Sequence, residues 1–427
     1  MLKKSDISPS FLVFALTVLA SVGFFNFHGI LKENIIKLIL FIFIGASTFM
    51  AYMNGRSLRG LHYHAHIYIL MLAGICFSAL MAYTQHDQPL TTSVIAVLPF
   101  FATYAYFFVA MKFDFDPDRI MRMYTTLAVA SAVVYFINVM TMPNNAFGKP
   151  ILGEDLSRGI LRIPLTFIEI FPLIVFYAIN KLIDTKKKIW LLPLAFASLM
   201  IFLSVVRQII AFTAVLGFLF YFRKISIFKK LIFIVAALTI VVYVLPMIPM
   251  YRTMIELSED QRDENEEEEN IRIQAWRFYT YENQENALTA IFGNGVPSAG
   301  NSTWGIIFDS EAEVSGKFTH DVGWAGFYFF FGIISTVALL MVIFYAIFKP
   351  KLPQYQFINY WLIMILLTCS ISGINLYSFQ VLNVSIVLAM VYYSGNNTLG
   401  IKPQSEETTE THPQTPRLIP KYPQLSD

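Results

Sequence analysis

Residues 319–332 read THDVGWAGFYFFFG and lead the chain from a long polar segment into an apolar helix. The polar segment begins after Pro249 and contains an acidic run at residues 256–269, ELSEDQRDENEEEE. Nearly all of the chain before this segment, and most of the chain after it, is apolar. The sequence therefore predicts a bundle of apolar spans that holds one large polar loop.

The composition is typical of an integral membrane protein. Of the 427 residues, 56% are hydrophobic and 14% are charged, whereas soluble proteins carry roughly 25% charged residues. Many apolar stretches approach the length of about 20 residues that crosses ~30 Å of hydrocarbon as a helix. They are continuous rather than alternating, which excludes a membrane β-barrel. We predict an all-α polytopic membrane protein with about twelve transmembrane helices.

The predicted spans divide the chain into four regions. Residues 1–249 form a transmembrane region of nine spans, and 250–321 form the large external loop between spans nine and ten. Residues 322–394 form a second transmembrane region of three spans, and the proline-rich tail at 395–427 is disordered and cytoplasmic. The spans lie near residues 10–27, 34–53, 66–83, 91–111, 120–140, 164–182, 189–204, 208–222, 231–249, 322–347, 357–373 and 379–394.

The basic residues predict the orientation. With the N-terminus in the cytoplasm, most of the 31 lysines and arginines fall on the inner side, as the positive-inside rule requires. Both termini are then cytoplasmic and the large loop is external. The two cysteines, Cys76 and Cys369, lie far apart inside apolar spans, so we expect no disulfide between them.

Three arginines depart from this orientation rule. Arg158 and Arg162 lie in the external connection between spans five and six, and Arg207 lies in LSVVRQII at the external membrane edge. A charge at such a depth is costly and usually has a polar partner or a ligand. The alternative is that each guanidinium reaches the lipid headgroups.

The external loop contains several features besides the acidic run. We expect that run to be solvated. Arg272 and Trp276 come after it in IRIQAWRFY, four residues apart and so on one helix face. The turn GNG at 293–295 lacks the strand and third glycine of a dinucleotide site. His320 precedes span ten and can exchange protons near neutral pH, and the glycines of that span predict close helix packing.

The sequence predicts no metal or cofactor. His62, His64 and His66 alternate in LHYHAH, but no Cys, Asp or Glu lies nearby to complete a ligand set. Interfacial histidines are the simpler interpretation.

Three segments together resemble a known family. They are LSVVRQIIAF, IRIQAWRFY with IFGNGVPSAGNS, and THDVGWAGFYFFFGII. Their order and membrane side resemble the O-antigen polymerase (Wzy-type) and O-antigen ligase superfamily of bacterial polytopic membrane glycosyltransferases. Arg207 is similar to the arginine of the family's Ser/Thr-x-x-Arg segment, and Arg272 and Trp276 to its Arg-x-x-x-Trp helix. Ligases more often carry His-Asn where this chain has His320 and Asp321, so the likeness is greater to polymerases.

The resemblance implies an enzyme of the bacterial cytoplasmic (inner) membrane that joins polyprenyl-diphosphate-linked oligosaccharide repeat units without a metal. Its donor and acceptor are both glycans, and a chain-length regulator and a flippase are the expected partners. Arg207 and Arg272 would hold the diphosphate, because guanidinium groups bind phosphate oxygens bidentately. His320 would be the general base and Asp321 its orienting partner. Further substrate contacts would come from Arg277, Arg158, Arg162, Trp276 and Trp324.

Three alternatives remain open at the level of sequence. A ligase would transfer the finished glycan to a lipid or protein acceptor. A transporter or flippase would carry buried charge near the middle of the membrane and interrupted helices. A membrane scaffold would have no catalytic role.

Overall fold

The computed structural model describes residues 8–22, 24, 33–54, 63–113, 115–141, 167–223, 247, 270–284, 286–372, 376 and 381–396. Within these ranges every regular element is a helix, and no strand occurs. The α-helices are α1 (Pro9–Ser21), α2 (Glu33–Asn54), α3 (Tyr63–His86), α4 (Leu90–Phe113), α5 (Pro117–Thr141), α7 (Ile170–Thr185), α8 (Leu191–Leu203), α9 (Arg207–Phe222), α12 (Ile271–Arg277), α13 (Ala287–Phe292), α14 (Thr303–Ser315), α15 (Gly323–Phe348), α16 (Phe357–Thr368) and α17 (Val381–Asn396). Short 3-10 turns occur at Lys188–Trp190, Thr319–Asp321 and Pro353–Tyr355, and a π-helical turn (Phe278–Glu282) continues from α12.

The all-helical prediction is confirmed for this part of the chain. Four helices are long and apolar enough to cross a membrane, namely Ala65–His86, Leu90–Phe113, Pro117–Thr141 and Gly323–Phe348. Other apolar helices, such as Pro9–Ser21 and Arg207–Phe222, are shorter and measure about 20–24 Å at 1.5 Å per residue. Predicted span nine lies outside the described residues except for Met247. The number of twelve spans therefore stays a prediction.

Local sequence signals account for several helix ends. The Ser8 hydroxyl accepts a hydrogen bond from the Phe11 N–H at the start of α1. Pro117 is the first residue of α5, where a missing N–H has no cost. Asn286 and Thr289 form a capping box at α13, which satisfies amide groups that the first turn of a helix leaves unpaired.

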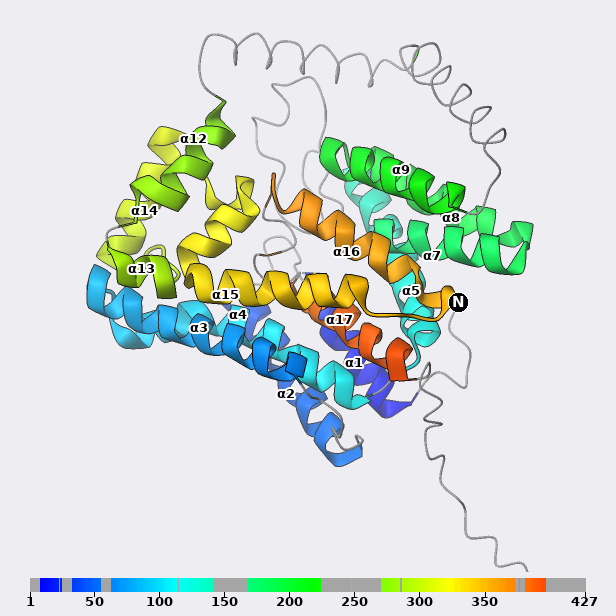
Figure 1. The fold of residues 1–427 in the computed structure, drawn as a ribbon, viewed down its shortest axis with the longest axis horizontal. Coiled ribbons are helices and arrows are strands. Elements are labelled where there is room, and N and C mark those ends of the chain that lie inside the picture. The colour runs from blue at the N-terminus through cyan, green and yellow to red at the C-terminus, as the bar shows by residue number, and fades with distance from the viewer. Residues whose placement is uncertain are drawn as a thin grey trace, which may run out of the picture.

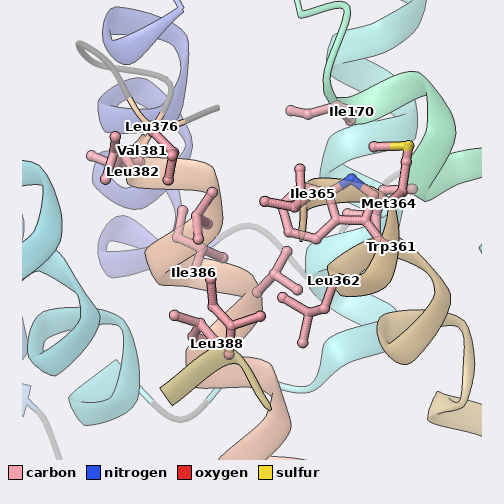
Figure 2. Close-up of a cluster of buried hydrophobic side chains, with 14 of the residues drawn as sticks. Ile170, Trp361, Leu362, Met364, Ile365, Leu376, Val381, Leu382, Ile386 and Leu388 are labelled. Carbon is pink, nitrogen blue, oxygen red and sulfur yellow. The ribbon is translucent and has the colours of Figure 1, made fainter. Parts of the chain in front are cut away.

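The helices pack as two adjoining groups (Figure 1). In one group α3 lies between α15 and α4, with α17 and α2 against α4. In the other, α7 packs against α8, α9 and α16, and α9 also packs against α16. Buried apolar side chains join the groups, and Figure 2 shows Leu362 and Ile365 of α16 facing Ile386 of α17. Helix α16 of the second group also packs against α15 of the first group. It therefore lies where the two groups adjoin.

Helix α15 is interrupted at Gly332, where φ is +71° and ψ is 177°. The turn at 293–295 docks on this break: the Asn294 N–H donates to the Phe329 carbonyl at 2.8 Å, and the Gly295 N–H to the Phe330 carbonyl at 3.0 Å. These carbonyls would otherwise accept bonds from the next helical turn. Close packing alone therefore does not explain Gly332, because this glycine permits a left-handed backbone.

The docked turn also contacts the end of α3. The Asn294 side chain lies 3.0 Å from His86 Nε2, and the His86 ring stacks on Trp304 of α14 with centroids 4.1 Å apart. The Gln88 side chain accepts from the Ser298 N–H and the Ser302 hydroxyl. Helices α13 and α14 thereby gather at the end of α3 marked by His86, at the left of Figure 1.

Candidate functional site

The predicted site residues that the structure describes lie near the C-terminal end of α16. Helix α9 runs antiparallel to α16: Phe220 stacks on Tyr360 with centroids 4.2 Å apart, and the Thr213 hydroxyl lies 3.6 Å from Met364 Sδ. Continuing this register brings the start of α9 level with the end of α16 (Figure 1). The first residue of α9 is Arg207. Arg207 is half-buried there.

Two tryptophans hold the same end of α16. The Trp276 indole N–H donates to the Ser370 carbonyl at 3.0 Å, and the Trp324 indole N–H donates to the Leu366 carbonyl at 3.2 Å. The backbone N–H of Trp324 also donates to the Cys369 carbonyl at 2.9 Å. A Cβ at Gly323 would collide with that carbonyl, so glycine permits this approach. The tryptophans therefore connect α12 and α15 to the last turn of α16.

His320 and Asp321 lie beside this junction, in the 3-10 turn (Thr319–Asp321) that contacts α12. His320 Nε2 is 3.9 Å from Asp321 Oδ1, and the side chains are 67% and 42% exposed. This separation is too long for a hydrogen bond. At this distance the Asp321 carboxylate can attract a positive charge on the His320 ring, but it does not fix the orientation of the ring.

Tyr279 fixes the position of this turn relative to α12. Its hydroxyl donates to the Lys317 carbonyl at 2.7 Å, and burial raises the pKa of the phenol. The Lys317 ammonium lies 4.9 Å from the centre of the Phe278 ring. The π-helical turn after α12 is therefore tied to the residues just before His320.

The arginines of α12 are exposed. Arg272 lies one helical turn before Trp276 on the same face, and Arg277 ends the helix. The structure thus brings Arg272, Trp276, Arg277, His320, Asp321 and Trp324 to one end of α16, with Arg207 at the same level. Arg158 and Arg162 lie outside the described residues.

An apolar groove of about 930 Å³ begins at this junction and lies between α15 and α16. Trp276, Thr280, Trp324 and Ser370 line it where α16 ends, and Phe344 and Phe348 line it farther along α15. From Ile333 to Phe348 the second half of α15 extends about 22 Å. The groove can accept a long apolar chain with a polar group at the tryptophan end.

A buried polar group near α16 was not predicted from the sequence. Glu169 is 2% exposed and accepts a hydrogen bond from Asn383 Nδ2 at 3.1 Å. The sequence signal was present, because Glu169 is a lone carboxyl inside predicted span six. Its partner on α17 could not be inferred from sequence separation.

No group of three potential metal ligands occurs within the described part of the chain. Of the three alternating histidines, His66 is exposed, whereas the side chains of His62 and His64 lie outside the described set. The acidic run at 256–269 also lies outside it.

A scan against models of protein families found no match, and a search of curated proteins found none either.

Proposed function

We propose that this chain is a polytopic membrane glycosyltransferase. It joins polyprenyl-diphosphate-linked oligosaccharide repeat units into a surface polysaccharide at the outer face of the bacterial cytoplasmic membrane. The observation that carries the proposal is an apolar groove whose entrance is lined by Trp276 of α12, the helix that bears Arg272 and Arg277. A polyprenyl diphosphate has the same division into a long apolar chain and an anionic head.

The arginines supply the charge that the donor requires. The diphosphate is the leaving group, so negative charge grows on its oxygens as the glycosidic bond breaks. Arg207 and Arg272 bind these oxygens and stabilise that charge, with Arg277, Arg158 and Arg162 as additional cations. In this mechanism the guanidinium groups neutralise the diphosphate.

The acceptor hydroxyl must lose a proton as it attacks. His320 accepts this proton, and Asp321 stabilises the imidazolium that forms. The separation of 3.9 Å between them shortens when the acceptor is bound, because catalytic hydrogen bonds often tighten only in the substrate complex. Trp276 and Trp324 define the groove entrance and contact the first sugar or the first isoprene units.

Single alanine variants test these roles. We expect Arg207→Ala, Arg272→Ala and His320→Ala each to lower elongation of a lipid-linked oligosaccharide at least 100-fold, the usual effect of removing one group that stabilises transition-state charge. Purified protein in lipid nanodiscs supplies the rate, and surface glycan length supplies the cellular readout. Arg223→Ala at the far end of α9, where the guanidinium lies 3.4 Å from Gln356 Oε1, is the matched control. Normal elongation by all three site variants would refute the assignment.

The same assay separates the proposal from its alternatives. If the chain is a ligase, cells with the inactive variants would still contain polymerised lipid-linked chains. They would lose only the transfer of these chains to the final acceptor. The interrupted helix α15 and the buried Glu169 are features that favour a transporter or flippase. Vesicles that contain labelled lipid-linked oligosaccharide distinguish these activities when both elongation and translocation are measured.

A further inference from the structure

Glu169 precedes α7 at a point where α5, α16 and α17 also meet. Its side chain is 2% exposed. Oε1 accepts a hydrogen bond from Asn383 Nδ2 at 3.1 Å, and Oε2 has no hydrogen-bond partner among the described residues. Within the described part of the chain the carboxyl is therefore buried with one of its two oxygens unsatisfied.

The described groups around Glu169 are neutral. The Glu169 backbone carbonyl accepts from the Trp361 indole N–H of α16 at 3.0 Å. The Asn383 amide oxygen of α17 accepts from the Tyr124 hydroxyl of α5 at 3.1 Å. The titratable group that faces Glu169 is the Tyr124 phenol, with Tyr106 of α4 beyond it. No lysine, arginine or histidine of the described residues forms an ion pair with Glu169.

An ionised carboxylate is unstable in such surroundings. Removing the charge from water costs far more than one neutral amide can return, so an isolated buried carboxyl usually takes up a proton. Carboxylates that remain ionised inside proteins accept several hydrogen bonds or have a cationic partner. A metal cation would also need several oxygen ligands, whereas Asn383 presents its amide nitrogen to Glu169.

We propose that Glu169 is a proton-binding site inside the helix bundle, with the proton on Oε2. The protonated acid keeps its hydrogen bond from Asn383 and places no charge among α5, α7, α16 and α17. It releases the proton only when water or a cation reaches Oε2. This assignment does not depend on the proposed glycosyl transfer, because it rests on the burial and partners of Glu169.

Infrared spectroscopy of the full-length protein in lipid nanodiscs tests the proposal. We expect the difference spectrum of wild type minus Glu169→Gln to contain the C=O stretch of a protonated carboxylic acid at pH 7. Glu311→Gln, which alters an exposed carboxylate of α14, is the control and should show only carboxylate bands. Carboxylate bands in the Glu169→Gln difference would overturn the proposal and indicate a cationic partner or a bound cation.

Thermal unfolding gives an independent test. Glutamine is nearly isosteric with protonated glutamate and accepts the same bond from Asn383. We therefore expect Glu169→Gln to unfold within about 4 °C of the wild type at pH 7. A variant that fails to fold, or unfolds at a much lower temperature, would show that the charge is required and would also overturn the proposal.

Discussion

Single glycines permit the contacts that shape the centre of this molecule. At Gly332 the left-handed backbone interrupts α15, and a Cβ there would collide with the Ile291 carbonyl. At Gly293 a Cβ would collide with the Phe330 carbonyl. The two glycines therefore face each other across one backbone-to-backbone contact, in which neither position has room for a side chain.

Gly332→Ala should destabilise the protein substantially. The backbone at Gly332 (φ +71°, ψ 177°) lies in a region that is essentially restricted to glycine and costs an L-residue about 1–3 kcal/mol. Overpacking adds about 1–3 kcal/mol, so we expect a total of about 2–6 kcal/mol. Thermal unfolding in detergent measures the effect. Gly45→Ala in α2 is the control, because a Cβ there meets no atom within 4 Å, and its stability should be unchanged or slightly higher. Equal unfolding temperatures for the two variants would contradict this account of Gly332.

At the level of elements, the break lets the two halves of α15 serve different contacts. The first half packs on the end of α16 through Trp324 and stacks Phe329 on Phe308 of α14. The second half runs along α16 and lines the groove together with Trp324, Ala325 and Tyr328 of the first half. A continuous helix would lack the glycine kink that separates these two surfaces. The groove therefore extends across the interruption.

The groove should bind the apolar part of the donor. Leu340 lines it, whereas the next residue, Met341, is 45% exposed and is not part of its lining. We expect Leu340→Trp to lower kcat/KM for a lipid-linked donor by about tenfold or more, through loss of about 1.4 kcal/mol of binding. Met341→Trp should have little effect. Equal kinetics in the two variants would show that the lipid binds elsewhere.

At the scale of the whole molecule, the helices enclose buried polar groups within an otherwise apolar bundle. Ser385 of α17 donates to the Thr103 carbonyl of α4 at 2.9 Å, and the Tyr124 hydroxyl of α5 donates to Asn383 Oδ1 of α17 at 3.1 Å. Such contacts specify which helices are neighbours, because an unpaired polar group is expensive in an apolar interior. The burial of apolar side chains alone specifies the neighbours of a helix less strictly.

The predicted orientation can be measured with introduced cysteines. In a chain lacking Cys76 and Cys369, we expect Glu264→Cys to react with a membrane-impermeant maleimide on intact spheroplasts. Lys187→Cys and Ser405→Cys should react only after permeabilisation, because the positive-inside rule places them in the cytoplasm. Labelling of position 405 on intact cells, or protection of position 264, would contradict the orientation.

The sequence by itself determined the local structure. Continuous apolar stretches predicted helices, and each predicted span outside residues 231–249 overlaps a helix, although the bounds of some differ by several residues. The spacing of Arg272 and Trp276 predicted a shared helix face, since the period of an α-helix is local. Topology was predicted only as far as hydropathy and charge allow, and the catalytic roles remain proposals.

Only the tertiary structure decided which distant residues meet. The position of Arg207 along α16 depends on the antiparallel register of α9 and α16. The role of Gly332 depends on a turn about forty residues earlier in the chain. Likewise, nothing near Glu169 in the sequence indicates Asn383 of α17 as its partner. Hydrogen bonds within a helix and side-chain hydropathy act locally, whereas these contacts arise from packing between helices far apart in the chain.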